Sequence, residues 1–374
     1  MRKIEDRSSN FRLASRFMIS LLILALLLTA GCSNRLENTG TPAQPDKQDV
    51  ITVTDCVGRQ VQVPAQIERV ACLCPESGHA MAMFGLGDRV VAVVGGMQRD
   101  VLLTNMYPHI KDLPVPKSSG IINIEELLNT DPDLVFVRSD TAANEAEMAK
   151  MKKTGLPFLV VDYADIDRQQ YALNMMGQAL GVQDKAQAYN DYYQQIVETV
   201  TARLADIPPE TRIRLYHSVN EALRTDAQGT LPADWIQVAG AINVSVGQDL
   251  KLYEGDYYAN LEQIMLWDPE VIICNEPGVA GYILSHEQWA PLQAVKAEKV
   301  WQLPIGISRW GHHSSLETPL AILWTAQRLY PERFTDVDLA AETKQFFQEF
   351  FNYKLSDELV QDILSGEGMR ETKG

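Results

Sequence analysis

The chain has 374 residues and a formal net charge of −16 at pH 7, with 33 basic and 49 acidic side chains. Its length is enough for about two domains. A hydrophobic content of 46% with a charged content of 22% excludes an intrinsically disordered protein. The excess of acidic residues also argues against a nucleic-acid partner, whose phosphates they would repel.

The first 31 residues have the composition of an export signal. Basic residues at positions 2, 3, 7, 12 and 16 precede an apolar run over 17–28, and small residues lead up to Cys32. This segment resembles a bacterial lipoprotein signal peptide, in which a peptidase cuts before a cysteine that carries diacylglycerol. The run is shorter than the ~20 residues of a membrane-spanning helix. We therefore expect cleavage after residue 31 and a lipid anchor on Cys32, which would hold the exported protein at the outer face of the cytoplasmic membrane.

Residues 32–49 are polar and contain two prolines, which predicts a flexible tether between the lipid and the folded body. An exported location would permit disulfides between the cysteines that follow. Their spacing is not typical of a zinc site, and we expect buried free thiols at Cys56, Cys72, Cys74 and Cys274.

From residue 50 onward, apolar runs typical of β-strands alternate with helical stretches. Two short runs around a turn at 55–58 predict an entry hairpin. Further strands are expected at 70–73, 90–94, 134–137 and 158–161 in the first half and at 213–216, 271–274 and 300–303 in the second. The alternation predicts an α/β fold of two Rossmann-like lobes, 50–183 and 208–374, each with a mostly parallel sheet covered by helices.

One segment occurs twice at a spacing of 137 residues. Ile124–Val135 and Leu261–Ile272 align without gaps, and each reads as a short helix, an Asp-Pro stop and an apolar strand. Glu125 and Glu262 occupy the second helical position, where the side chain is free of the capping box and favours the helix dipole. A carboxylate there is also common without further function. Its recurrence at matched sites suggests that each lobe displays one acid and that the pair holds one partner symmetrically.

Between the lobes, the sequence predicts one long linker helix over residues 184–207. The span 184–206 lacks glycine and proline, and its apolar residues keep helical spacing. A single stiff helix should allow only a modest closure of the lobes on ligand binding. After the second lobe, closing helices are expected, and the aromatic residues at 346, 347, 350 and 351 should pack in the core.

Two such lobes place the loops at their strand ends around a shared cleft, where small ligands usually bind. The loop over 306–313 combines a cation, an aromatic face and two imidazoles, so we expect Arg309, Trp310 and His312 to contact an anionic, aromatic or metal-bearing ligand. Trp310 lies outside any periodic pattern that would place it in the core. Further candidate ligand-binding residues are Glu76, His217, Arg224 and Tyr257, and His312 and His79 are candidate metal ligands.

Motifs of common enzyme classes are missing from the sequence. It contains no dinucleotide fingerprint after a strand, no Gly-x-Ser-x-Gly elbow, no His-Glu-x-x-His helix and no phosphate-binding loop. We therefore expect a binding protein with no catalytic residues and no intrinsic cofactor.

Residues 50–335 contain Asp55-x-x-Gly58-Arg59, Leu-Gly-Asp-Arg-Val-Val-Ala-Val at 86–93, and the two glutamate-bearing repeats. With these motifs, the segment resembles the substrate-binding lipoproteins of ABC importers for ferric siderophores, haem and cobalamin, the class in which one helix joins two lobes. The resemblance implies a monomer that captures a metal chelate (a ferric siderophore, haem or a corrinoid) and delivers it to a permease dimer with its ATPase. It also implies that Glu125 and Glu262 engage arginines on the two permease subunits.

Two other interpretations stay open. Histidines in the cleft would suit a receptor for a metal ion or small metal complex, such as nickel or zinc. The same scaffold would also suit an exported metallochaperone or enzyme, although no catalytic motif supports it.

Overall fold

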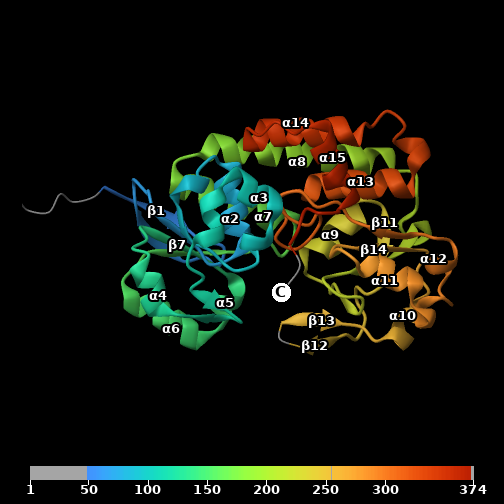
Figure 1. Cartoon of the computed structure of the whole chain (residues 1–374), viewed down its shortest axis with the longest axis horizontal. Coiled ribbons are helices and arrows are strands. Elements are labelled where there is room, and N and C mark those ends of the chain that lie inside the picture. Colours follow the sequence, from blue (N-terminus) through green and yellow to red (C-terminus); the bar gives the residue numbers. More distant parts are fainter. Residues whose placement is uncertain (1–48, 254, 372–374) are drawn as a thin grey trace, which may run out of the picture. The chain divides into compact units, whose positions relative to one another are not determined.

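Two four-stranded parallel sheets lie at the centres of two α/β lobes in the computed structural model, which describes residues 49–253 and 255–371 (Figure 1). The expected signal peptide, Cys32 and nearly all of the expected tether lie outside the described residues. Within the described ranges, no helix combines the length and the hydropathy needed to cross a membrane. The predicted fold class, α/β with mostly parallel sheets in two lobes, is confirmed.

The N-terminal lobe contains a parallel sheet of order β4–β3–β7–β8. Its strands are β3 (Val70–Cys72), β4 (Val90–Ala92), β7 (Leu134–Arg138) and β8 (Phe158–Val161). Alternate residues of β7 and β8 belong to two separate core clusters, because the sheet is covered on both faces. The helices around it are α2 (Pro75–Met83), α3 (Val101–Met106), α4 (Ile124–Asn129), α5 (Ser139–Ala143), α6 (Glu145–Thr154) and α7 (Ile166–Leu180). The entry hairpin is confirmed as β1 (Val50–Thr54) paired antiparallel with β2 (Gln60–Pro64).

The C-terminal lobe repeats this plan with a parallel sheet of order β11–β9–β14–β15. Its strands are β9 (Ile213–Ser218), β11 (Ala241–Asn243), β14 (Val271–Cys274) and β15 (Val300–Gln302), and its helices include α9 (Leu231–Val238), α10 (Leu261–Trp267), α11 (Val279–Ser285) and α12 (Gln293–Lys296). A small antiparallel sheet of β10 (Arg224–Thr225), β13 (Asp256–Tyr258) and β12 (Lys251–Tyr253) was not predicted. Its strands are only two or three residues long, and β12 is exposed throughout, so no apolar alternation marks them.

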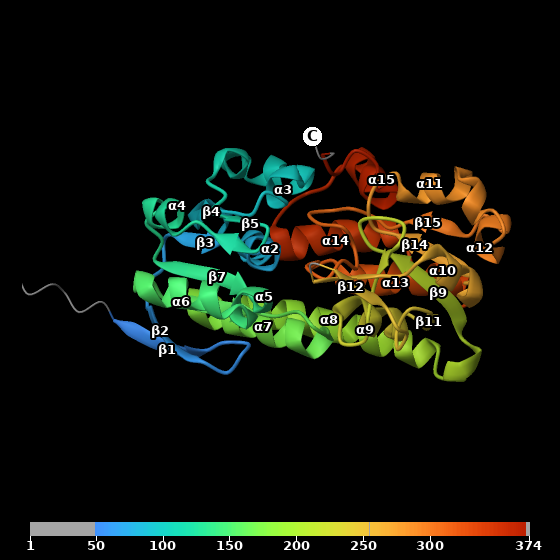
Figure 2. The same cartoon turned by 90° about the horizontal axis from the view of Figure 1, so that it is seen from below.

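Helix α8 (Gln183–Arg203) runs from one lobe to the other (Figure 2). It packs against α7 in the N-terminal lobe and against α9 and α13 (Thr318–Leu329) in the C-terminal lobe. The expected linker helix is therefore present, although it ends at Arg203. Helices α14 (Leu339–Phe351) and α15 (Asp357–Ser365) follow, and the predicted core packing of the four α14 phenylalanines is confirmed, since each is at most 7% exposed.

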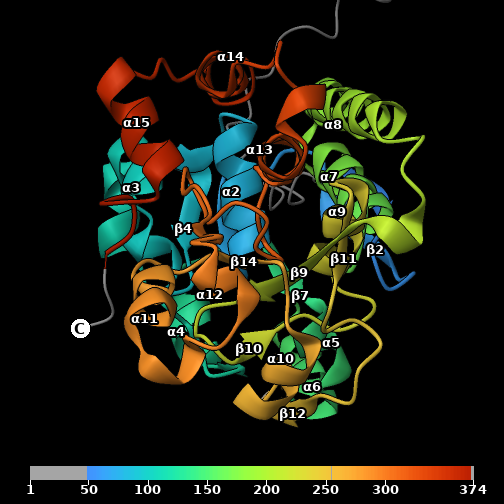
Figure 3. The ribbon, with the colours of Figure 1, turned by 90° about the vertical axis from the view of Figure 1, so that its right-hand side faces the viewer.

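A second segment, which was not predicted from the sequence, also joins the lobes. After α15, residues 366–371, here called the C-terminal strap, return to the N-terminal lobe beside α3 (Figure 3). Two backbone hydrogen bonds, of 2.9 and 3.3 Å, pair the strap with Arg99, just before α3, and with Val101, the first residue of α3. Arg370 of the strap forms an ion pair with Asp100. The lobes are thus connected both by α8 and by the strap.

The four cysteines in the described ranges are free thiols. Cys72, Cys74 and Cys274 are buried, as expected, and Cys56 is partly buried. Burial raises the pKa of Cys56, Cys72 and Cys274 to about 12, so these thiols stay protonated and unreactive at neutral pH.

Candidate functional site

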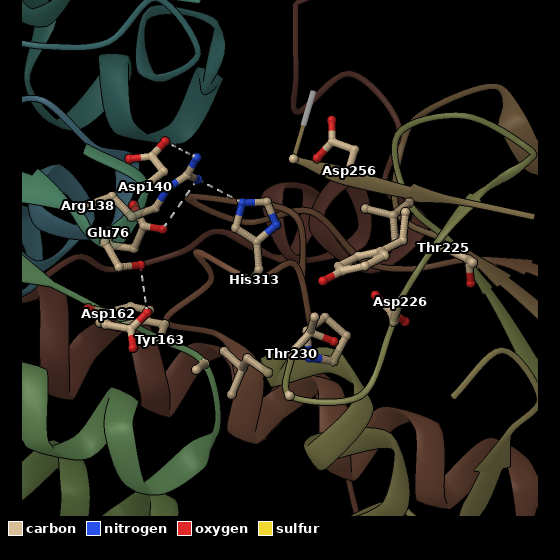
Figure 4. Close-up of a pocket in the computed structure, with 18 of the residues that line it drawn as sticks. Glu76, Arg138, Asp140, Asp162, Tyr163, Thr225, Asp226, Thr230, Asp256 and His313 are labelled. Atoms are coloured by element: carbon tan, nitrogen blue, oxygen red, sulfur yellow. Dashed lines mark hydrogen bonds and ion pairs between the residues drawn. The ribbon is translucent and has the colours of Figure 1, made fainter. Parts of the chain in front are cut away.

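A cavity of about 460 Å³ lies between the two lobes (Figure 4). Its N-terminal wall is built where parallel strands end. Arg138 is the last residue of β7, Asp140 follows it in α5, and Asp162 and Tyr163 follow β8, while Glu76 lies in the first turn of α2. The carboxyl ends of neighbouring parallel strands meet at one edge of the sheet, which brings these five side chains together. The predicted candidates included Glu76 but not Asp140, Asp162 or Tyr163, and position directly after a strand is the signal that identifies them.

The C-terminal wall comes from the small antiparallel sheet, from the loop between β10 and α9, and from His313. Arg224 of β10 and Tyr257 of β13, two of the candidates selected from the sequence, both line the cavity. Arg224 forms an ion pair with Asp256 at 2.5 Å. Asp226, also in the wall, lies 2.8 Å from Nδ1 of the fully buried His217. His217 therefore orients a cavity carboxylate and does not itself line the cavity.

Arg138 connects the two walls. Its Nη2 donates to Oδ2 of Asp140 at 2.7 Å, and its Nη1 donates to Nε2 of His313 at 3.2 Å across the cavity. Burial lowers the pKa of Arg138, but the charges of Glu76 and Asp140 outweigh it and raise that pKa above its ordinary value. Burial raises the pKa of Asp140, but Arg138 and then Lys117 outweigh it and hold that pKa below its usual range. Both groups therefore stay ionised at physiological pH.

His312 and His313 are neutral at physiological pH. Burial lowers the pKa of each well below its ordinary value, and the nearest arginine lowers it further, Arg309 for His312 and Arg138 for His313. Nε2 of His312 lies 3.1 Å from Nη2 of Arg309. Because a guanidinium only donates, both Nε2 atoms accept, and the ring proton of His313 is assigned to Nδ1. His313 lines the cavity and presents a neutral donor to it, whereas the buried His312 lies outside the lining.

Trp310 corrects a prediction. The sequence placed it in the ligand cleft, but its side chain is 0% exposed, belongs to the main core cluster and does not line the cavity. The loop folds inward because the buried carboxylate of Glu317 accepts from the backbone N–H groups of Ile307 at 2.6 Å and Ser308 at 3.3 Å. A lack of strand or helix periodicity therefore did not mean exposure.

Arg309 is also largely buried and lies outside the cavity lining. Its side chain is 10% exposed and forms an ion pair with Glu276. Burial, together with the charge of Arg370, lowers the pKa of Arg309 to about 10. Arg309 therefore supports the cavity indirectly, by holding His312 next to His313.

The structure does not bring the candidate metal ligands together. His79 is 2% exposed, and its Nε2 lies 3.1 Å from Oδ2 of Asp100. Burial lowers the pKa of His79, but the hydrogen bond and charge of Asp100 outweigh it and raise that pKa overall. Within residues 49–253 and 255–371, no group of three or more His, Cys, Asp or Glu side chains is placed to hold a metal ion. His79 and His312 each belong to a separate structural contact.

Glu125 and Glu262 are both exposed on short helices that lie on the side of the two lobes facing away from α14 (Figures 1 and 3). Asn260 and Gln263 form the complete capping box at the start of α10. In α4, Glu126 accepts from the backbone N–H of Val115 at 3.3 Å. Neither Glu125 nor Glu262 has a hydrogen-bond or ion-pair partner in the described part of the chain.

Known proteins share both sequence and fold with this chain. A family model described as "Periplasmic binding protein" matches residues 70–305. The molybdate-binding protein MolA of Haemophilus influenzae is 26% identical over 329 residues, which cover 80% of this chain and 90% of MolA. A vitamin B12-binding protein of Vibrio cholerae is 24% identical over 243 residues, which cover 64% of this chain and 82% of that protein.

Solved structures have the same fold. MolA bound to molybdate matches with a TM-score of 0.73 at 23% identity, over 82% of this chain and 99% of MolA. Helicobacter pylori CeuE with Ni(II) bound matches with a TM-score of 0.68 at 22% identity, over 84% of this chain and 99% of CeuE. Together with the two-lobe fold and the cavity between the lobes, these similarities identify the chain as a member of the periplasmic binding protein family, a non-enzymatic substrate-binding protein of an ABC importer.

Proposed function

We propose that this protein captures a metal chelate in the cavity between its lobes and delivers it to the importer's permease. The observation that carries the proposal is the cavity itself, which both lobes line with charged and aromatic side chains held by ion pairs. Its volume of about 460 Å³ is within the range of roughly 300–1,000 Å³ for small-molecule sites. A compact ferric siderophore suits this volume best. Haem or a corrinoid would extend from the cavity mouth.

A receptor for a bare nickel or zinc ion is less well supported. Such ions need three or four protein ligands, and the described residues offer no such group. The Nε2 lone pairs of His312 and His313 already accept from arginines. A metal therefore fits this site best when it arrives inside a chelator that supplies its ligands.

We also propose that Glu125 and Glu262 dock onto arginines of the permease. Their exposure and lack of partners leave both carboxylates available for charge-assisted hydrogen bonds, which orient a complex and speed its formation. A monomer with one such acid per lobe matches a permease dimer with one arginine site per subunit. A lipid on Cys32 would keep the protein at the membrane surface, close to that permease.

Titration calorimetry tests the ligand assignment. A ferric trihydroxamate, haem, cobalamin, molybdate, Ni²⁺ and Zn²⁺ are titrated into the purified protein, and we expect the ferric chelate to bind most tightly. Replacing Arg138 with Gln removes the contact between the two walls and should weaken that binding by about tenfold. The matched variant Arg89→Gln, at a partly exposed ion pair away from the cavity, should bind as the wild type does. Tighter binding of molybdate or a bare metal ion than of every chelate would refute the assignment.

An uptake assay tests the docking. The double variant Glu125→Ala with Glu262→Ala should abolish transport and leave ligand affinity unchanged. A control with the same loss of charge, Glu145→Ala with Glu287→Ala, removes one exposed acid from each lobe and should transport normally. Normal transport by the first double variant would show that these acids do not dock.

A further inference from the structure

Glu76 is a buried carboxylate in the cavity wall that is only weakly paired. The residue is 1% exposed, and its Oε1 lies 3.9 Å from Nη1 of Arg138, beyond hydrogen-bonding distance. Its Oε2 has no hydrogen-bond partner among residues 49–253 and 255–371. An ionised carboxylate taken out of water is unfavourable unless donors surround it, so an unpartnered oxygen here calls for an explanation.

The other four carboxylates of the cavity wall all have close partners. Asp140 is paired with Arg138 and Lys117, and Asp256 with Arg224. Asp162 accepts hydrogen bonds from Arg168 and Ser139. Asp226 is hydrogen-bonded to His217 and Asn243. Glu76 therefore stands apart from the rest of the lining.

Tyr163 is the second unsatisfied group in the same wall (Figure 4). It is 5% exposed, and its hydroxyl has no hydrogen-bond partner in the described ranges. Burial raises the pKa of Tyr163 well above its ordinary value, and the charge of Glu76 raises it further, so the hydroxyl stays protonated. The N-terminal wall of the cavity therefore contains a carboxylate oxygen and a hydroxyl that both lack a hydrogen-bond partner among the described residues.

The lining of the cavity as a whole is negatively charged. It contains five carboxylates and two guanidiniums, an excess of three negative charges, while His313 is neutral. An oxyanion such as molybdate would have to separate Arg138 or Arg224 from its carboxylate before it gained a cationic partner. A ligand that carries its own positive charge avoids that cost and supplies the hydrogen-bond donor that Glu76 lacks.

We infer that the ligand carries a cationic hydrogen-bond donor, of the ammonium class, that binds between Glu76 and Tyr163. This inference rests on the proposed function and narrows it to chelates with a protonated amine. The Glu76 carboxylate accepts a hydrogen bond from one N–H of the ammonium group. The hydroxyl oxygen of Tyr163 accepts from another N–H of the same group. The Nδ1–H of His313, on the opposite wall, donates to an acceptor oxygen of the same ligand.

Two matched probes test the inference. One is a linear ferric trihydroxamate with a free terminal ammonium, and the other is the same chelate with that amine acetylated, which keeps the metal site and removes the charge. We expect the wild-type protein to bind the ammonium form at least about tenfold more tightly. Glu76→Gln, which keeps the shape of the side chain, should reduce that ratio to about one, and Tyr163→Phe should reduce it partially. The control Glu145→Gln, at an exposed acid outside the cavity, should leave it unchanged.

Equal affinity of the wild-type protein for the two chelates would overturn the inference but leave chelate capture intact. Tighter binding of molybdate than of the ammonium form would overturn it as well, and so would a Glu76→Gln variant that keeps the full preference. If the protein binds neither chelate, nor haem, nor cobalamin, both the inference and the proposed function fail. Thermal unfolding of each variant confirms that the titrated protein is folded.

Discussion

Replacing Trp310 with Ala tests whether this side chain stabilises the core of the protein or contacts the ligand directly. The indole is fully buried in the main core cluster, and large-to-small changes of this kind cost about 3–5 kcal/mol. Unfolding entropies of about 2.1 cal/mol/K per residue, over roughly 320 described residues, convert this cost into a fall in Tm of roughly 4–7 °C. Circular dichroism during heating and urea unfolding measure the loss. Ligand affinity should fall only indirectly, because the loop that carries His313 loosens.

Trp310→Phe is the matched control, because it keeps an aromatic ring in the core and should lose clearly less stability. Trp301→Ala is a second control, since that indole is partly exposed beside Arg328. The reasoning is refuted if Trp310→Ala unfolds like the wild-type protein and yet no longer binds ligand, which would make Trp310 a direct ligand contact.

Three further outcomes are expected. Arg370→Ala should free the C-terminal strap from Asp100 and increase the ligand-dependent change in small-angle scattering. The control variant Arg333→Ala, which breaks an ion pair away from the strap, should not increase it. Scattering curves of Arg370→Ala identical to those of the wild-type protein would contradict a role for the strap. Stability should fall as the pH drops below about 6.5, because the pKa of His312 is lowered in the folded state and the unfolded chain takes up the proton. Urea unfolding of His312→Gln should show a shallower acid loss, and an equal slope would exclude His312 as the cause. Ni²⁺ and Zn²⁺ should leave the Tm of the ligand-free protein unchanged, and a clear rise would reveal a metal site.

The central sheets were predictable because their strands are continuous apolar runs between turn signals. The strands β7 and β14 follow the Asp-Pro stops of the two repeats, and their burial is complete except for Arg138 at the end of β7. The small antiparallel sheet was not predictable, because β12 is exposed and β10 has only two residues. Tertiary pairing, which joins β10 to β13 across more than thirty positions of sequence, sets these strands.

The candidate site was also predictable only in part from the sequence. Glu76, Arg224 and Tyr257 line the cavity because loops at strand ends converge there. The roles of His217 and Trp310 depend on burial, which their local sequence does not encode. The strap left no sequence signal either, because Arg370 meets Asp100 only through the folded arrangement of the lobes.

Native mass spectrometry of the protein purified from its own host tests the central claim most directly. We expect one metal chelate with a protonated amine per chain, retained in full by the wild-type protein and by Arg89→Gln and at clearly lower occupancy by Arg138→Gln. A bare metal ion, an oxyanion, or a chelate that the Arg138→Gln variant retains in full would contradict capture of an amine-bearing chelate between the lobes.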